Sequence, residues 1–386
     1  MKFKRIFLIV LDSLGVGEAI DADKYNDKGV NTLGHIVDKT DLFIPNLEKM
    51  GLLNTLKMNN SSSDGYYTIA RPKICSKDCI SCHREMMGIE DEQYQFFNNG
   101  PLPRPLLENI AMTLQKPIIG NIVGDAIGTI QKLYKRQLET KSLIIYTTGD
   151  SNLEVACEES VFSINELYEY CEKIRNITLK NEWKLSSVVA RPYRIENNQI
   201  VLSDDAKIFS LNPINKSVLE LLKNAGLQTI SIGKINDLFN GYGINKVIKA
   251  QNNSEATNKL LDIMEKNFNG LCYINLSDFE NSYGYSHNVE GYKKALEEFD
   301  VEIPMILNKI NLDDLLIITS DHGCDPTIDK VGNTRENVPV LLYSRSFIES
   351  GQLNILDTLA DIGATIADNF DVTNPWMGTS FLDKLK

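Results

Sequence analysis

The sequence lacks any apolar run approaching the roughly 20 residues that a membrane-spanning helix needs, so no contact with a membrane is predicted. It also lacks an excess of basic residues: the net charge is -12, which argues against a nucleic-acid-binding surface. Internal repeats and a glycine-rich phosphate loop are absent too. The 7 cysteines are an odd number scattered over 386 residues, which does not resemble a disulfide framework and predicts a reducing cytoplasm.

The rest of the composition is that of an ordinary soluble globular protein, with 42% hydrophobic and 24% charged residues. The length allows two domains or one large domain. Near the N-terminus, a basic stretch precedes a short apolar run and could mimic a signal peptide. However, Asp12 interrupts the run and no small-residue cleavage site follows, so Arg5–Leu11 is predicted to be a core strand.

Polar residues follow several apolar runs at the point where a strand is expected to end. Leu315–Thr319 leads into Ser320, Asp321 and His322, and the first strand leads into Asp12. Continuous apolar strands are typical of a parallel sheet that is covered on both faces, where chemistry gathers at the carboxyl ends. Asp12, Asp321 and His322 together predict a divalent metal site. Taken singly, each residue could instead cap a turn or a strand end.

Three cysteines and a histidine crowd into one stretch, Cys75, Cys79, Cys82 and His83. One cysteine could be a thiolate nucleophile whose pKa is lowered by basic neighbours. The spacing could also hold zinc or an iron–sulfur cluster, or the cysteines could be small buried hydrophobic residues. The spacing alone does not choose between these three alternatives.

Other segments predict a second unit and long helices. A separate βα unit is expected from about Tyr94 to Pro213. Within it, Arg191 follows a short strand and could bind an anionic substrate or form an interdomain salt bridge. Glu290–Ile310 is predicted to be an amphipathic helix that is broken or kinked at Pro304.

A resemblance is carried by motifs that run in order along nearly the whole chain. The sequence resembles the phosphopentomutase family of the alkaline phosphatase superfamily in the segments LDSLGVGEA, NTLGH, PNLEKMGL, KPIIGN, ARPY, IGKINDLF, NVEGYKKALEEFD, LLIITSDHGCDPT, TRENVPVLLYS, DIGATIADNF and GTSFL.

The resemblance implies an α/β fold, with an alkaline-phosphatase-like doubly wound core and an inserted smaller α/β cap domain. The core is expected at residues 1–93 and 214–386, and the cap at 94–213, with hinges near Tyr94–Pro105 and Ser210–Asn215. The family moves phosphate between C1 and C5 of ribose or deoxyribose with two manganese ions and a phosphorylated threonine. A small phosphorylated sugar is therefore the expected ligand.

The departures from the family pattern fall on the active site. The position of the phosphorylated threonine is Cys79 in SKDCISCHREMMG. One metal site carries over onto Asp12, Asp321 and His322. At the other site, Glu280 stands for an aspartate, while Tyr285 and Asn333 stand for two histidines and are poor replacements for imidazole.

Manganese is the expected metal, and the soft sulfur makes zinc the alternative. Two functions stay open at this point. One is a phosphopentomutase-like metalloenzyme with Cys79 as the phosphate acceptor. The other is an impaired or inactive paralogue that binds a phosphorylated ligand or a protein partner. The residues expected to bind the substrate are Ser151, Arg191, Lys234 and Arg335.

Overall fold

The structure is a computed structural model that describes residues 1–57, 62–89, 100–149, 151–330, 332–373 and 377–386. The chain divides into two compact units, which are described separately. The larger comprises Met1–Asp91, Pro213–Asp329 and Asn333–Lys386, and the smaller comprises Glu92–Asn212 and Lys330–Gly332. The predicted boundary at residues 93 and 94, and the hinge residue Tyr94, lie outside the described residues.

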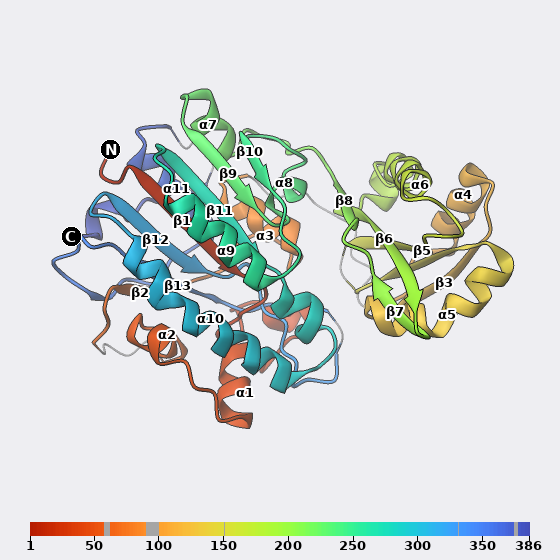
Figure 1. Cartoon of the computed structure of the whole chain (residues 1–386), viewed down its shortest axis with the longest axis horizontal. Helices are drawn as coiled ribbons and strands as arrows, with labels where there is room; N and C mark the ends of the chain where they lie inside the picture. The colour runs from red at the N-terminus through yellow and green to blue at the C-terminus, as the bar shows by residue number, and fades with distance from the viewer. Residues whose placement is uncertain (58–61, 90–99, 150, 331, 374–376) are drawn as a thin grey trace. The chain divides into compact units, whose positions relative to one another are not determined.

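The larger unit is built on an eight-stranded sheet (Figure 1). Five neighbouring strands are parallel, as the continuous apolar sequences Arg5–Leu11 and Leu315–Thr319 predict for two of them. The strands beyond these five add antiparallel pairs, so the sheet is mixed. In spatial order the strands are β10 (Lys246–Ile248), β9 (Gln228–Ile232), β11 (Gly270–Leu276), β1 (Arg5–Leu11), β12 (Asp314–Thr319), β13 (Val338–Tyr343), β2 (Tyr66–Ala70) and β14 (Gly351–Gln352).

Helices cover both faces of this sheet. Residues that alternate along the strands, such as Cys272 and Ile274, pack in one hydrophobic cluster with α1 (Thr32–Lys39), α2 (Pro45–Lys49), α9 (Asn253–Met264) and α10 (Val289–Lys309). Figure 1 shows α9 and α10 lying along the strands. Tyr273 points to the opposite face, where its hydroxyl meets His83 of α3 (Cys79–Met86). On the same side, α3 packs with α11 (Ala360–Asn369), which also contacts α7 (Val218–Asn224).

The helix predicted around Pro304 is continuous, because α10 runs through this residue. A proline removes one backbone donor from a helix but does not end it when tertiary packing supplies enough stabilisation. Here Phe299, Ile303 and Ile306 are buried on either side of the proline. The amphipathic pattern was therefore the stronger signal, and the predicted break was wrong, whereas the alternative of a kink at Pro304 stays a prediction.

The strand order brings three chain segments together at one edge. β1 lies between β11 and β12, and its register pairs Leu11 with Leu276 and Val10 with Thr319. The carboxyl ends of these three parallel strands therefore meet, although they are far apart in sequence. This is the place where doubly wound sheets open a crevice for ligands.

The smaller unit has its own six-stranded sheet and its own core. The capping box at Ser163 and Glu166 starts one of its helices, as the pattern Ser-x-x-Glu favours. Its strands are β3 (Ile118–Val123), β4 (Leu143–Thr147), β5 (Asn152–Glu158), β6 (Ser187–Glu196), β7 (Gln199–Leu202) and β8 (Lys207–Ser210), and its helices are α4 (Arg104–Leu114), α5 (Ala126–Thr140) and α6 (Ile164–Ile177). In neither unit is any described helix long and apolar enough to cross a bilayer.

Candidate metal centre

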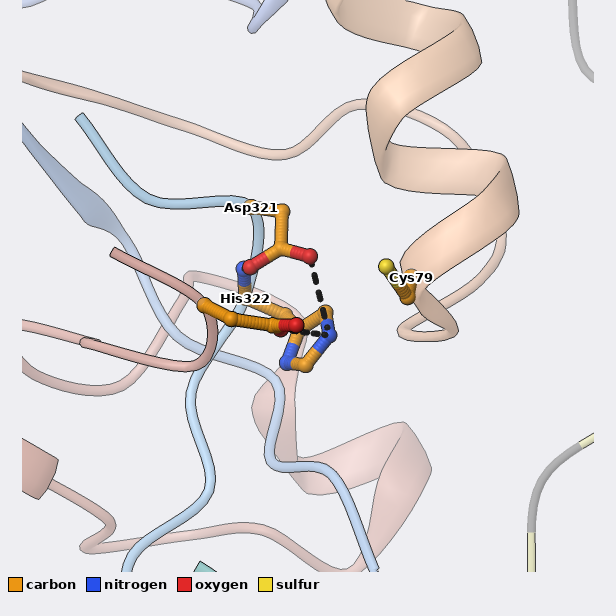
Figure 2. Close-up of side chains that lie close together, drawn as sticks. Cys79, Asp321 and His322 are labelled. Carbon is orange, nitrogen blue, oxygen red and sulfur yellow. Dashed lines mark hydrogen bonds and ion pairs between the residues drawn. The ribbon is translucent and has the colours of Figure 1, made fainter. Parts of the chain in front are cut away.

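Four side chains converge at the carboxyl edge of the larger sheet. Asp12 follows β1, Asp321 and His322 follow β12, and Cys79 is the first residue of α3. Each offers one ligand atom, and the four atoms all lie within 4.8 Å of one another. Figure 2 shows the Cys79 sulfur projecting from the start of its helix towards Asp321 and His322. The structure therefore brings together the three strand-end residues and the cysteine that the sequence predicted.

The position of Cys79 is set by the residue before it. Asp78 has extended backbone angles and caps α3, because its carboxylate accepts hydrogen bonds from the Ser81 N–H at 3.0 Å and the Ser81 hydroxyl at 2.6 Å. Asp78 is itself buried. An aspartate three residues ahead of a serine, at the start of a helical pattern, is a local signal that could have been recognised in the sequence, but the cap was not predicted.

Both metal-facing side chains after β12 are oriented by hydrogen bonds. Asp321 Oδ1 accepts from the backbone N–H groups of Ser13 and His322, at 3.0 and 3.1 Å. His322 Nδ1 lies 3.0 Å from the Gly323 carbonyl oxygen, to which it can donate. With that proton on Nδ1, Nε2 is the nitrogen that faces Asp12 and Asp321, which is the arrangement of a ligating imidazole.

A second buried histidine, His83, supports the Asp321 carboxylate. His83 Nε2 lies 3.3 Å from Asp321 Oδ2, while Nδ1 contacts the Tyr273 hydroxyl. The side chain is fully buried on α3, one helical turn after Cys79. A metal site shared with the nearby cysteines was one of the alternatives for His83 in the sequence, whereas the structure makes it a neighbour of the carboxylate that follows β12.

The electrostatics of the cluster favour a cation. Burial, together with repulsion from Asp321 and Glu280, raises the pKa of Asp12 well above its usual value. Burial also raises the pKa of the Cys79 thiol, and the same carboxylates add to the increase. Burial alone would lower the pKa of His322, but Asp321, Glu280 and Asp12 raise it to about 10. The cluster therefore carries an excess of negative charge, and a divalent ion bound to His322 Nε2 would replace the proton on that nitrogen.

The residues present fit a metal ion. Within the described ranges, Asp12 Oδ1 is buried without a hydrogen-bond partner. Asp12 Oδ2 forms a close ion pair with Lys234, and Asp321 Oδ2 lies near the Nε2 atoms of His322 and His83. Buried charged oxygens without hydrogen bonds are costly unless a charge or a metal compensates them. Two carboxylates, one imidazole and one sulfur form a mixed donor set that suits manganese or zinc.

Glu280 and Lys234 lie beside this group but are paired with each other. Glu280 follows β11, and its Oε2 is 3.3 Å from Lys234 Nζ. The same ammonium forms a close ion pair with Asp12 Oδ2. Glu280 Oε1 accepts from the Tyr285 hydroxyl at 2.8 Å. The metal role predicted for Glu280 and the substrate role predicted for Lys234 both stay predictions, although each residue lies next to the candidate ligands.

Arg335 lies in the same unit but is only 1% exposed. Its guanidinium is held by the Asp21 carboxylate at 2.9 and 3.2 Å and by the carbonyl oxygens of Pro72 and Ser76. Ser76 lies just ahead of α3. These contacts favour a structural role for Arg335, which secures the segment that leads to Cys79, over the substrate-binding role predicted from the sequence.

Ser151 and Arg191 belong to the smaller unit. Ser151 is buried, and its hydroxyl and carbonyl both accept hydrogen bonds from Ser186. Arg191 pairs with the buried Glu154 carboxylate at 2.7 Å. Both residues therefore support the sheet of the smaller unit, and their predicted roles in substrate binding stay predictions.

The cysteine-rich stretch does not gather around a metal of its own in the described part of the chain. The candidate ligand group that forms there contains Cys79 but neither Cys75, Cys82 nor His83. Cys75 is exposed ahead of α3, whereas Cys82 is buried inside the helix. The start of α3 therefore separates Cys75, which precedes the helix, from Cys79 and Cys82, which lie within it.

Comparison with known proteins identifies the family. The model of the metalloenzyme superfamily matches residues 4–374. The chain belongs to this superfamily. The metalloenzyme family implies a divalent metal, and the four converging residues provide a candidate site for it.

Two solved structures are similar to the chain at low sequence identity. A Pyrococcus horikoshii protein is 12% identical, with a TM-score of 0.50 over 98% of this chain and 100% of the other. A Leishmania mexicana phosphoglycerate mutase, crystallised at low cobalt concentration, is 9% identical, with a TM-score of 0.49 over 98% of this chain and 97% of the other. The mixed α/β fold predicted from the sequence is thus confirmed, with one sheet in each of the two units.

Proposed function

We propose that this metalloenzyme moves phosphate between C1 and C5 of ribose or deoxyribose, as phosphopentomutases do, with Cys79 as the phosphate acceptor. The observation that carries the proposal is the position of the Cys79 sulfur among Asp12, Asp321 and His322. A nucleophile placed against metal ligands is the arrangement that phosphoryl transfer requires. The motif order of the phosphopentomutase family supports the choice of a sugar phosphate as substrate.

The reaction needs Cys79 as a thiolate. A divalent ion, when bound, supplies Lewis acidity that polarises a phosphoryl oxygen and favours deprotonation of a ligating thiol. The Cys79 sulfur then attacks phosphorus, and the S–P bond forms. The bond between phosphorus and the sugar oxygen breaks, and that oxygen takes up a proton. In the second step the other sugar hydroxyl loses its proton and attacks phosphorus, and the S–P bond breaks to restore the thiolate. No net oxidation or hydrolysis occurs.

The residues around Cys79 have distinct tasks in this scheme. Asp78 holds the sulfur at the start of α3 through its cap. The Lys234 ammonium, which is paired with Asp12, adds positive charge next to the phosphoryl group and offsets the charge of the transition state. The Asp321 carboxylate is held in place by backbone donors from Ser13 and His322.

A second candidate function is a paralogue that binds a phosphorylated ligand without turning it over. The specific observation in its favour is the setting of Cys79: burial and three carboxylates raise the pKa of its thiol. A neutral thiol is a poor nucleophile. In this case the metal and the residues that hold it would serve recognition rather than reaction.

The experiment that separates the two is conversion of ribose 1-phosphate to ribose 5-phosphate, followed by phosphorus NMR with manganese and then with zinc. Wild type is compared with Cys79→Ala, and Cys75→Ala serves as the matched control because Cys75 is exposed and outside the ligand group. Conversion that is abolished only in Cys79→Ala supports the mutase. Equal conversion in Cys79→Ala refutes the role of the sulfur, and no conversion by wild type with either metal favours the binding paralogue.

A further inference from the structure

His83 and Tyr273 form a buried polar pair beside the candidate metal ligands, and the proposed reaction does not use either residue. His83 lies on α3 and Tyr273 lies on β11, and both side chains are fully buried. The Tyr273 hydroxyl contacts His83 Nδ1, while His83 Nε2 lies 3.3 Å from Asp321 Oδ2. The pair therefore connects the middle of β11 with the carboxylate that follows β12.

Backbone donors decide which oxygen of Asp321 can bind a metal ion. Oδ1 accepts hydrogen bonds from the backbone N–H groups of Ser13 and His322, at 3.0 and 3.1 Å. A carboxylate oxygen has about two lone pairs, so these two donors occupy Oδ1. Oδ2 is then the ligating oxygen, and it is the oxygen beside His83 Nε2.

The surroundings of the His83 ring favour a proton on Nε2. Burial lowers the pKa of His83, which favours a neutral ring with one N–H group. If that proton were on Nδ1, the Nε2 lone pair would face the Asp321 carboxylate. The Tyr273 O–H would then have to donate to the Met86 sulfur at 3.4 Å, which is a weak acceptor. With the proton on Nε2, Tyr273 donates to Nδ1 and Nε2 donates to Asp321.

Asn275 is a further polar neighbour of the same nitrogen. Its side-chain amide nitrogen lies 3.3 Å from His83 Nε2, and its Oδ1 has no hydrogen-bond partner among the described residues. Turning the amide over exchanges its oxygen and nitrogen. Asn275 Oδ1 can then accept from the same Nε2–H group, so this neighbour is compatible with a proton on Nε2.

We propose that His83 is a positioning residue of the metal centre: the Tyr273 hydroxyl fixes its Nε2–H tautomer, and this N–H group holds Asp321 Oδ2 in place as a metal ligand. The inference rests on the metal centre of the proposed function and deepens it, because it assigns a residue that orients one ligand from outside the group of four. Removing such a partner typically weakens metal binding by about 10–100-fold.

Two measurements without substrate test the role of His83. The first is nitrogen NMR of the imidazole rings in metal-free protein with isotope-labelled histidine. The chain has 4 histidines, and the His83 signals are those lost in His83→Gln. The second is calorimetric titration with manganese and with zinc of wild type, His83→Phe, Tyr273→Phe and His83→Gln, which can keep an N–H donor.

His35→Phe is the matched control for the titration. His35 also contacts an aspartate, because its Nδ1 lies 2.6 Å from Asp325 Oδ2, but neither residue belongs to the ligand group. Circular dichroism checks that each variant is folded.

The expected result is a proton on Nε2 and none on Nδ1 of His83, together with a metal Kd that rises by about 10–100-fold in His83→Phe. The rise should be smaller in His83→Gln and Tyr273→Phe and absent in His35→Phe. A proton on Nδ1 alone would overturn the proposal even if no variant folds. An unchanged Kd in folded His83→Phe, or an equal rise in His35→Phe, would also overturn it.

The two proposals can fail separately. A wild type that shows the expected tautomer and metal affinities but does not convert ribose 1-phosphate contradicts the proposed reaction alone. An active wild type whose His83 carries its proton on Nδ1 contradicts this inference alone.

Discussion

The candidate metal centre predicts that divalent ions stabilise the larger unit. The perturbation is addition of manganese or zinc to protein stripped with a chelator. An ion that binds only the folded state, at 100 times its dissociation constant, adds about 2.7 kcal/mol to the free energy of unfolding. The larger unit spans roughly 260 residues, and an unfolding entropy of about 2.1 cal/mol/K per residue converts this gain into a rise of about 5 °C in Tm.

The assay is thermal unfolding by calorimetry, with and without the metal. Asp12→Asn replaces a buried carboxylate whose Oδ1 has no hydrogen-bond partner among the described residues, so the rise should be lost. Asp262→Asn is the matched control, because Asp262 is exposed on α9, and should keep the full rise. An equal rise in Asp12→Asn, or no rise in wild type with either metal, would refute the assignment of the site.

Three further predictions concern residues around the site and in the smaller unit. Asp78→Ala should lower the free energy of unfolding by about 1–2 kcal/mol through loss of a helix cap and weaken metal binding; Asp125→Ala, which removes the cap of α5, should affect stability alone. Urea unfolding and metal titration check both, and unchanged metal binding in Asp78→Ala would contradict the account. Arg335→Met should cost about 3 kcal/mol of stability, because it leaves a paired carboxylate and buried carbonyls without their donor; a stable variant with only a raised KM would point to substrate binding instead. Arg191→Ala should destabilise the smaller unit by about 2 kcal/mol, because it leaves the buried Glu154 charge unpaired. An unchanged urea midpoint would refute that contact.

The strand-end part of the site could be predicted from the sequence. β1 and β12 are continuous apolar runs that stop abruptly at Asp12 and at Asp321, and parallel strands bring such ends together. The antiparallel edge of the sheet could not be predicted in the same way. β13 is as apolar as its neighbours because it too is buried, so the composition does not distinguish its direction.

The contacts of long and charged side chains could not be predicted, because they depend on three-dimensional packing. Lys234 and Arg335 were both expected to bind substrate, and their contacts within the chain were not predicted. Lys234 pairs with Asp12, and Arg335 is buried against backbone carbonyls. Similarly, the spacing of Cys75, Cys79 and Cys82 carried no information on where α3 begins, and that boundary decides which sulfur joins the metal ligands.

The most direct test of the central claim is to find the phosphate on Cys79. Wild-type protein loaded with metal is mixed with ribose 1-phosphate, quenched rapidly at mildly alkaline pH, and digested for peptide mapping by mass spectrometry. The account predicts a phosphoryl group on the Cys79 sulfur and none in Cys79→Ala. Turnover of the sugar phosphate with the phosphoryl group on another residue, or with the same adduct level in Cys79→Ala, would contradict it.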